Sequence, residues 1–413
     1  MNKSIAVIGG GISGITSALE LANSGFRVYL IEREAAIGGQ AASFCCKATD
    51  ICTKCSACLI PEKLNEAAAH PKISVLADST VTGLSGKAGD FQVEVLRRPH
   101  YIAPERCVAC GICAGVCPTE PKAIRPPSPD AVPYCYVVDE TQCLHLRGEE
   151  CNLCQGTCPT NAIDFGWEPE KKKLSVSAII VATGFEAFDA RGIGSLGYGR
   201  YPNILTGLDL ERILKDQDSL KLPSNGKEAK RIAFIQCVGS RNEGRGYCSQ
   251  VCCKYAMRFA RLIKYQNPEA EVTIFYIDLQ TAGKGFAEFY DECRRLVQFI
   301  RGVPVEILET SGGLEVRFEN ILEGKVERET FDLVVLSIGI TPRKDSWSLA
   351  RVLGVNLGEH GFFANKESFN SIETDVGGIF LAGTCQGPKD IPDSIAHAVA
   401  AAEKAMGVLE KCK

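Results

Sequence analysis

Eight cysteines in the middle of the chain follow a spacing that few folds can accommodate. In the first group the cysteines are separated by two, two and three residues, and the second group has intervals of seven, two and three residues. Each group ends in Cys-Pro. The groups comprise Cys107, Cys110, Cys113 and Cys117, and then Cys143, Cys151, Cys154 and Cys158. Thiolates in this duplicated pattern are the ligands of two [4Fe–4S] clusters.

In modules of this bacterial ferredoxin type, the last cysteine of each group binds the cluster of the other group. We therefore assign Cys158 to the cluster of the first three cysteines, and Cys117 to the cluster of the second three. The interval between Cys143 and Cys151 departs from the usual two residues. Structural zinc or unlinked thiols are the alternative, although zinc sites do not require eight thiolates in this arrangement.

The whole chain is rich in cysteine, with 21 in 413 residues. Its first residues run directly into an apolar strand, without the segments of a signal peptide. No apolar stretch of about 18 residues predicts a membrane span. We therefore expect a cytoplasmic protein whose reduced thiols bind metal rather than form disulfides. The net charge of −4, with acidic and basic residues interspersed, argues against a nucleic-acid partner.

The N-terminal segment predicts a dinucleotide-binding fold. An apolar strand leads into Gly-Gly-Gly-Ile-Ser-Gly, an amphipathic helix and a second strand that ends at Glu32. In this pattern Gly9 makes the tight turn, Gly11 lets the backbone approach a pyrophosphate, and Gly14 lets the helix pack against the strand. The pyrophosphate then lies at the helix N-terminus. Glu32 is expected to accept hydrogen bonds from the adenosine ribose.

Two later segments favour FAD over NAD. Residues 177–184 form an apolar strand that ends in Ala-Thr-Gly, like the strand that closes over FAD in two-dinucleotide flavoproteins. Residues 378–384 form a strand before a helix, as in the final FAD motif of thioredoxin-reductase-like enzymes. The alternative is that both are ordinary buried strands. The expected FAD-binding residues are Gly9, Gly11, Ser13, Gly14, Glu32, Arg33, Gly39, Gln40, Ala182, Thr183, Gly184, Gly383, Thr384, Gln386 and Ile391.

A second nucleotide-binding unit is expected after residue 229, but its sequence argues against NAD(P)H. The strand over residues 230–235 is followed by Gln-Cys-Val-Gly-Ser-Arg instead of Gly-x-Gly-x-x-Gly. Without that turn a helix N-terminus cannot come close to a pyrophosphate. We expect the cysteines that follow to bind another [4Fe–4S] cluster, with a redox dithiol or free buried cysteines as the alternative. They are Cys237, Cys248, Cys252 and Cys253.

A further cysteine-rich segment lies near the N-terminus. Cys52, Cys55 and Cys58 follow one another at intervals of two residues, and Cys46 or Cys45 can loop back as a fourth ligand; we assign Cys46. Zinc would satisfy the same thiolates, but the eight cluster ligands elsewhere favour iron. Most of the remaining cysteines are expected to be small packed hydrophobes. They are Cys45, Cys135, Cys293, Cys385 and Cys412.

The order of these motifs resembles that of the heterodisulfide reductase A subunits and their relatives in class II benzoyl-coenzyme A reductase complexes. The most specific segments are Cys237–Cys253 and Gln386–Asp393, and the resemblance covers nearly the whole chain. It implies FAD among four [4Fe–4S] clusters, and electron exchange with other redox subunits and with ferredoxin. Electron bifurcation in several members and a homodimeric core are further implications.

The same resemblance points to two catalytic residues. The family often has lysine near flavin N5, five residues after the Cys-Cys pair, and this chain has Arg258 there. Arginine keeps the positive charge but does not readily give up a proton. Cys385 is the second candidate, because it follows directly after the expected flavin-contacting segment Gly383-Thr384.

These observations predict an α/β fold with three parts. A thioredoxin-reductase-like FAD domain is expected from residues 1–98, 167–229 and 361–413, a vestigial second Rossmann-like domain from residues 230–360, and an inserted two-cluster α+β ferredoxin module from residues 99–166. The expected function is that of an oxidoreductase, namely the electron-transfer subunit of a larger reductase complex. Two alternatives are an NAD(P)H-dependent flavoenzyme of the glutamate synthase small-subunit type and a zinc-bearing scaffold.

Overall fold

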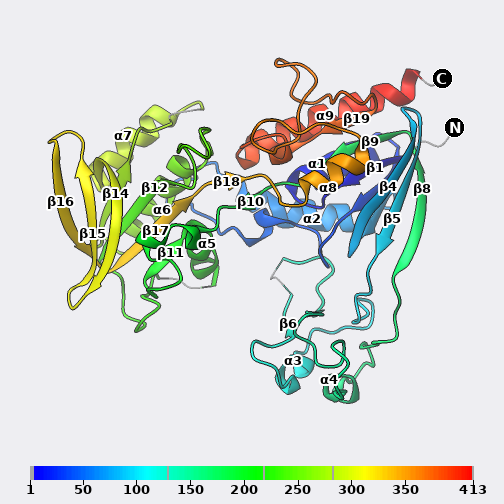
Figure 1. Ribbon diagram of the computed structural model, residues 1–413, viewed down its shortest axis with the longest axis horizontal. Coiled ribbons are helices and arrows are strands. Elements are labelled where there is room, and N and C mark those ends of the chain that lie inside the picture. Colours follow the sequence, from blue (N-terminus) through cyan, green and yellow to red (C-terminus); the bar gives the residue numbers. More distant parts are fainter. Residues whose placement is uncertain (1–3, 128–129, 217–218, 281–282, 412–413) are drawn as a thin grey trace.

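The structure, a computed structural model, describes residues 4–127, 130–216, 219–280 and 283–411. Figure 1 shows a first lobe that holds both ends of the chain, a second lobe rich in strands, and a small cysteine-rich module below the first lobe. Within the described ranges, no helix combines the length and the apolar character needed to cross a membrane.

The first lobe is built on a parallel sheet. Its strands and helices are β1 (Ser4–Ile8), α1 (Ile12–Asn23), β2 (Arg27–Ile31), α2 (Ile60–Ala69), β3 (Ile73–Leu76), β9 (Ala178–Val181), β19 (Ile379–Leu381) and α9 (Ile391–Lys411). The strand order is β19-β9-β1-β2-β3. The strands are rich in Val, Ile and Leu because both faces are buried. Ile5 and Val7 face α1 and α9, whereas Ala6 and Ile8 face an antiparallel sheet.

That antiparallel sheet carries the cysteine-rich module. Its strands, in spatial order, are β4 (Ser79–Lys87), β5 (Asp90–Arg97) and β8 (Glu170–Val176). Arg97, at the end of β5, pairs with Glu170, at the start of β8. The chain therefore leaves the sheet and returns to it at one rung, that is, at one pair of directly opposed residues. The module contains α3 (Ile112–Val116), β6 (Ile124–Arg125), β7 (Val137–Val138) and α4 (Leu153–Thr157). Its small core consists largely of cysteines together with Ile102, Ile124 and Ile163.

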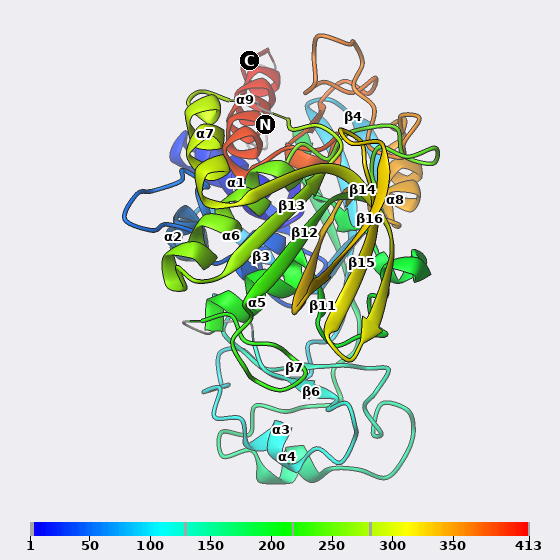
Figure 2. The same cartoon turned by 90° about the vertical axis from the view of Figure 1, so that its left-hand side faces the viewer.

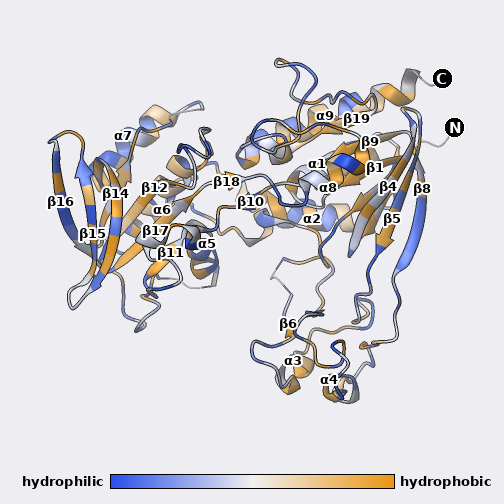
Figure 3. Cartoon of the chain, viewed as in Figure 1, coloured by the Kyte–Doolittle hydropathy of each residue, from blue (hydrophilic) through white to orange (hydrophobic). Residues whose placement is uncertain are grey.

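The second lobe, which faces the viewer in Figure 2, contains a seven-stranded sheet. Its elements are β11 (Ile204–Thr206), α5 (Gly207–Asp216), β12 (Arg231–Val238), α6 (Cys252–Gln266), β13 (Glu271–Tyr276), α7 (Phe286–Leu296), β14 (Gln298–Thr310), β15 (Gly313–Asn320), β16 (Lys325–Phe331) and β17 (Leu333–Ile338). The order is β11-β17-β12-β13-β14-β15-β16, with antiparallel pairing only from β14 onward. The edge strands β8 and β16 are largely hydrophilic (Figure 3), which disfavours pairing with another chain.

The packing differs from the expected segments in two places. β11 and α5 fall in the expected FAD segment 167–229, but β11 pairs with β17 of the second lobe. Conversely, α8 (Ser346–Leu353) falls in the expected segment 230–360, but it packs against β4 of the first lobe. The reason is hydrophobic: Ala350 and Leu353 of α8 complete the core of the antiparallel sheet. Between the lobes, β10 (Glu186–Ala187) pairs with β18 (Ile340–Thr341).

Candidate flavin cavity and cysteine clusters

A cavity of about 970 Å³ is lined by both lobes. The first lobe contributes the glycine turn, the end of β2 and the Ala-Thr-Gly segment after β9, and the second lobe contributes parts of α5, α6 and the end of β17. Three of the expected FAD residues, Gly14, Gly383 and Gln386, are not in its lining. The expected residues that line it are Gly9, Gly11, Ser13, Glu32, Arg33, Gly39, Gln40, Ala182, Thr183, Gly184, Thr384 and Ile391.

The glycines of the turn have different roles: Gly14 allows close packing of α1, and Gly11 leaves space for a cofactor. A Cβ atom on Gly14 would lie 1.8 Å from the Gly9 carbonyl oxygen, so only glycine lets α1 pack this closely. Gly9 itself has φ +110°. A Cβ on Gly11 would meet nothing nearer than the Gly39 Cα at 4.0 Å. The space beside Gly11, where α1 begins, is therefore open for a pyrophosphate.

The carboxylate of Glu32 is fixed at the end of β2. Its oxygens accept the Gly10 N–H at 2.5 Å and the Glu34 N–H at 2.8 Å. Burial raises the pKa of Glu32, and these two backbone hydrogen bonds oppose that effect. Glu32 lines the cavity, as a ribose-binding acid should.

One wall of this end of the cavity was not predicted from the sequence. β4 and α8, which pack against each other, both line the cavity, and the segment before α8 adds Arg343 and Asp345. The wall was missed because α8 was expected to belong to the second lobe, and its position depends on the chain's return to β4. Its other lining residues are Ser79, Thr80, Val81, Ser348, Leu349 and Val352.

Three cationic side chains of the lining come from α6 and from the segment before α9. Arg258 lines the cavity, and its Nη2 donates to the Thr53 carbonyl at 3.0 Å. Lys254 also lines the cavity and pairs with Asp390 at 2.9 Å. Lys389 is a third cation there, and burial lowers the pKa of its amine. This charge favours a ligand that carries or develops negative charge, such as a reduced flavin.

Four buried polar atoms at the cavity have no hydrogen-bond partner among the described residues. They are the Thr183 and Tyr255 hydroxyl oxygens, the Arg258 Nε and the Arg343 Nη2, and all four residues line the cavity. Buried polar groups are normally paired, so such orphans fit a site that a polar ligand completes. The open glycine turn, the fixed acid and these orphans together fit FAD.

Cys385 does not lie where a catalytic thiol must. It is 2% exposed, is absent from the cavity lining, and its S–H donates to the Val181 carbonyl at 3.0 Å. Burial raises the pKa of this thiol to about 11. The expectation of a catalytic role is therefore corrected: the 3-10 turn at Gly383–Cys385 directs the side chain back toward β9, and Cys385 is structural.

In the cysteine-rich module, four thiols surround one small cavity of about 20 Å³. They come from both cysteine groups, in the combination expected for one cluster: Cys107, Cys110, Cys113 and Cys158. In the other expected set, burial raises the pKa of Cys154 to about 11, and the nearby Cys143 and Cys151 add to the effect. Burial opposes ionisation of Cys117 as well, but hydrogen bonds, led by that of the Thr119 hydroxyl, outweigh it and lower its pKa.

The three cysteine-rich segments share one backbone feature. In each, the residue two positions after a cysteine adopts a left-handed conformation, with φ of 52°, 51° and 61°. In the N-terminal segment and in the second lobe, the backbone N–H of that residue also donates to the cysteine sulfur, at 3.4 and 3.3 Å. The three residues are Lys54, Ala109 and Gln250, which follow Cys52, Cys107 and Cys248.

The cysteines of the second lobe lie close together. Burial raises the pKa of Cys252 well above its ordinary value, and the neighbouring Cys237, Cys253 and Cys248 contribute further. In the N-terminal segment, Cys55 lines the large cavity, whereas Cys46, Cys52 and Cys58 are exposed. Cys412 lies outside the described residues.

Across the described ranges, no three His, Cys, Asp or Glu side chains converge on a point that one metal ion could occupy. In a [4Fe–4S] cluster four cysteine thiolates hold four irons. A single zinc ion instead requires all its thiolates about 2.3 Å from one point.

Three family models match segments of the chain. The model of the pyridine nucleotide-disulphide oxidoreductase family matches residues 137–405. An NAD(P)-binding Rossmann-like domain matches residues 7–52, and a 4Fe-4S binding domain matches residues 100–121. These matches confirm a flavin-type redox fold with iron–sulfur binding.

Solved structures confirm the expected fold class. The thioredoxin reductase of Lactococcus lactis is 16% identical with a TM-score of 0.55, and the alignment covers 99% of each chain. The thioredoxin reductase of T. acidophilum is 13% identical with a TM-score of 0.54, and the alignment covers 100% of each chain. At these identities the likeness concerns the fold alone.

Curated relatives confirm the expected resemblance. The A subunit of the H(2):CoB-CoM heterodisulfide,ferredoxin reductase of Methanothermobacter marburgensis is 39% identical, over 97% of this chain and 63% of the relative. The iron-sulfur A subunit of the CoB–CoM heterodisulfide reductase of Methanocaldococcus jannaschii is also 39% identical, over 97% and 64%. This chain thus spans less than two thirds of the length of these relatives. It belongs to the pyridine nucleotide-disulphide oxidoreductase family, and within it is similar to the A subunits of heterodisulfide reductases.

Proposed function

We propose that this chain is the FAD- and iron–sulfur-containing electron-transfer subunit of a larger reductase complex. The observation that carries the proposal is the arrangement around the large cavity. Cys55 of the N-terminal segment lines it directly, and Val251, next to Cys252 of the second lobe, lines it as well. Two expected cluster sites thus adjoin the proposed flavin site from different lobes.

In the second lobe, the described residues around the end of β12 do not form the glycine turn that binds a nicotinamide dinucleotide. The turn after β12 contains Gly239 with φ +82°, where a Cβ atom would lie 2.1 Å from the ring of Phe188. The aromatic ring therefore fills space beside the strand end. The next helix, α6, begins only at Cys252 and brings thiols instead of a glycine turn. This supports electron entry through clusters, and it disfavours the glutamate-synthase-like alternative.

The proposal includes four [4Fe–4S] clusters. The shared left-handed turn supports this number, because it gives the two less regular cysteine segments the same local geometry as the ferredoxin-type module. For the N-terminal cluster we propose Cys46 as the fourth ligand. Cys45 is buried, its N–H donates to Glu211 at 2.9 Å, and burial raises the pKa of its thiol to about 12, which disfavours the thiolate.

When bound, FAD would supply the ability to exchange electrons singly or in pairs. The chain would hold its adenosine through Glu32, its diphosphate at the start of α1, and its ring system near Arg258, Lys254 and Lys389. Arg258 would hold positive charge there without acting as a proton donor. The hydrogen bond from its side chain to the Thr53 carbonyl would also fix the N-terminal cysteine segment beside the ring.

The proposed partners are other redox subunits, because the curated relatives are named as A subunits of reductases, and ferredoxin, because the names of several relatives include it. A homodimeric core, a cytoplasmic location and electron bifurcation belong to the same proposal. The number of cysteines supports the location, since so many reduced thiols require a reducing compartment.

The proposal is tested on protein purified without oxygen, by optical and EPR spectra combined with assays of FAD, iron and zinc. We expect one FAD and about 16 irons per chain, since each cluster holds four. Zinc in place of iron, without a flavin spectrum, would support the scaffold alternative instead.

A further inference from the structure

Arg343 is a cavity residue whose hydrogen-bonding capacity is only partly used. It lies in the short segment between β18 and α8, where the chain passes from the second lobe to the first, and it lines the large cavity. Its Nε donates to the Asp345 carboxylate at 3.0 Å. Its Nη2 is buried and has no hydrogen-bond partner among the residues that the structure describes.

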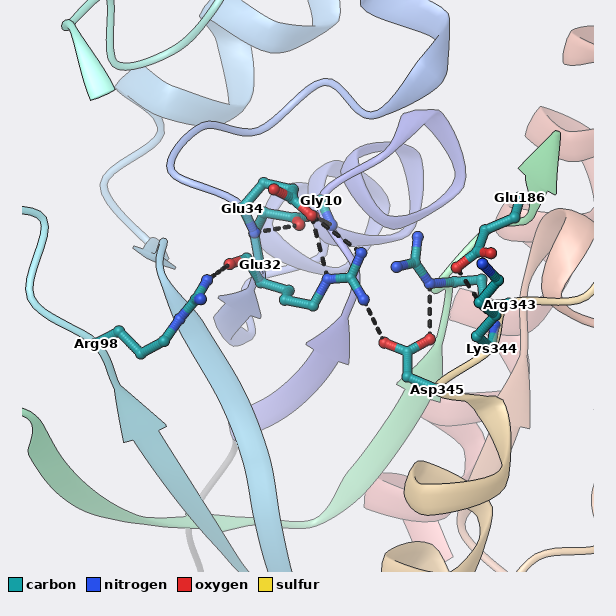
Figure 4. A network of polar contacts seen from close by, with 9 residues as sticks. Gly10, Glu32, Glu34, Arg98, Glu186, Arg343, Lys344 and Asp345 are labelled. Atoms are coloured by element: carbon teal, nitrogen blue, oxygen red, sulfur yellow. Dashed lines mark hydrogen bonds and ion pairs between the residues drawn. The ribbon is translucent and has the colours of Figure 1, made fainter. Parts of the chain in front are cut away.

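The neighbouring arginine is different, because its charge is already compensated. Arg33 Nη1 contacts the second oxygen of Asp345 at 2.6 Å, and its Nη2 contacts Glu34 at 3.0 Å. Asp345 is therefore shared between two guanidinium groups (Figure 4). Arg33 contacts two carboxylates, Glu34 and Asp345, whereas Arg343 contacts only Asp345 and shares it with Arg33. Among the described residues, Arg343 therefore keeps donor capacity that Asp345 does not use.

The position of Arg343 indicates which anionic group of a ligand it could contact. Asp345 links Arg343 to Arg33, and Arg33 directly follows Glu32 after the end of β2. Glu32 in turn accepts the Gly10 N–H within the glycine turn. Arg343 thus lines the same cavity as the glycine turn, at the end where Glu32 and Arg33 also lie. The terminal nitrogens of Arg343 point away from Asp345 in Figure 4.

We propose that Arg343 binds the diphosphate of FAD and that Asp345 orients it for this contact. The proposal rests on the proposed FAD site and adds a ligand from the interlobe segment to it. A guanidinium group suits this role because its planar donors match phosphate oxygens in pairs. Because the segment joins the two lobes, the diphosphate would also hold the crossing chain in place.

The experiment measures how apo protein of the full chain, with its clusters retained, binds FAD, ADP and adenosine. The variants are Arg343→Met and Arg343→Lys. The control is Arg98→Met, because Arg98 belongs to the same polar network, donating to the Arg33 carbonyl at 2.9 Å, but does not line the cavity. Adenosine lacks the diphosphate, so it separates a phosphate contact from a general weakening of the fold. Iron content and circular dichroism check the folding of each variant.

We expect Arg343→Met to weaken FAD and ADP binding about tenfold or more, and to change adenosine binding less than about twofold. Arg343→Lys should lose less, since it keeps the charge without the paired donors. Arg98→Met should bind all three as the wild type does. Equal losses for ADP and adenosine, or no loss, would overturn the role of Arg343 while leaving the FAD site intact. Absence of FAD binding by the wild type would overturn both proposals.

Discussion

Lys47 Nζ lies 2.6 Å from Glu211 Oε1, and this ion pair joins the N-terminal cysteine segment to α5 of the second lobe. The side chains are only 4% and 7% exposed. Lys47 also donates to the Cys45 carbonyl at 3.0 Å and lies over the Phe259 ring at 4.9 Å. The two lobes are therefore joined by a buried charge pair at the edge of the cavity.

Removing one partner of this pair should destabilise the chain strongly. Lys47→Met leaves the Glu211 carboxylate buried and unpaired, and the free energy of unfolding should fall by about 3–5 kcal/mol. Lys47→Met combined with Glu211→Gln should recover much of the loss. Thermal denaturation of the holoprotein measures both. As a control, Lys173→Met breaks the exposed pair with Glu94 and should cost less than about 1 kcal/mol.

Two glycines of the same turn should respond differently to substitution. Gly11→Val places its side chain in the open space beside α1, so the chain should fold and retain iron but lose FAD. Gly14→Ala places a methyl group 1.8 Å from the Gly9 carbonyl, so it should lower stability as well as FAD content. FAD-to-protein and iron-to-protein ratios, with melting temperatures, distinguish the two. Stoichiometric FAD in Gly11→Val would show that the cofactor binds elsewhere.

NADH and NADPH should not reduce the purified chain at a useful rate. β12 ends with Cys237 and Val238, and in the turn after it Gly239 packs against Phe188, where a phosphate-binding glycine turn would be needed. Stopped-flow absorbance of the oxidised flavin after mixing with each nucleotide measures the rate, and dithionite provides the positive control. Rapid bleaching by NADH would favour the self-contained flavoenzyme over the electron-transfer subunit.

Replacing both Cys252 and Cys253 by serine should remove about four irons per chain and leave the ferredoxin-type clusters. The reason is that both thiols lie among the four close cysteines of the second lobe. Iron analysis and EPR of the reduced protein measure the change. Cys293→Ser is the matched control, since Cys293 is fully buried and contacts the Met257 carbonyl. Unchanged iron in the double variant would identify these thiols as structural or as a redox dithiol.

His397 should make the flavin-side turn sensitive to acid. Its Nδ1 accepts the Gly383 N–H at 2.9 Å, and burial, aided by Lys389, lowers its pKa from 6.5 to about 4. The folded state therefore resists protonation, and stability present above pH 6.5 is lost as pH falls toward 4. By pH 5.5 the loss should be about 1 kcal/mol. Denaturation of wild type and His397→Gln at pH 7.5 and 5.5 measures it, and equal pH dependence in both would contradict the assignment.

The parts of the site that were predictable are those that local sequence encodes. The glycine turn and Glu32 follow from a short pattern whose geometry is fixed by φ and by close packing, and the cysteine spacings carry their own chemistry. The α8 wall was not predictable, because its position depends on the chain crossing back to the first lobe. Cys385 was misassigned for a related reason: adjacency to Thr384 in sequence does not determine on which side of a 3-10 turn the thiol lies.

The pairing of Arg97 with Glu170 has a consequence for how such proteins arise. Because the chain departs from the antiparallel sheet and returns to it at one rung, residues 98–169 could be excised and β5 and β8 would still be neighbouring strands. An insertion at that rung leaves the order and register of every strand of the host unchanged. Recombination at this position could therefore insert a cluster-binding module into a flavin-binding fold, or replace one such module by another, without changing the strand pairing of the host domain.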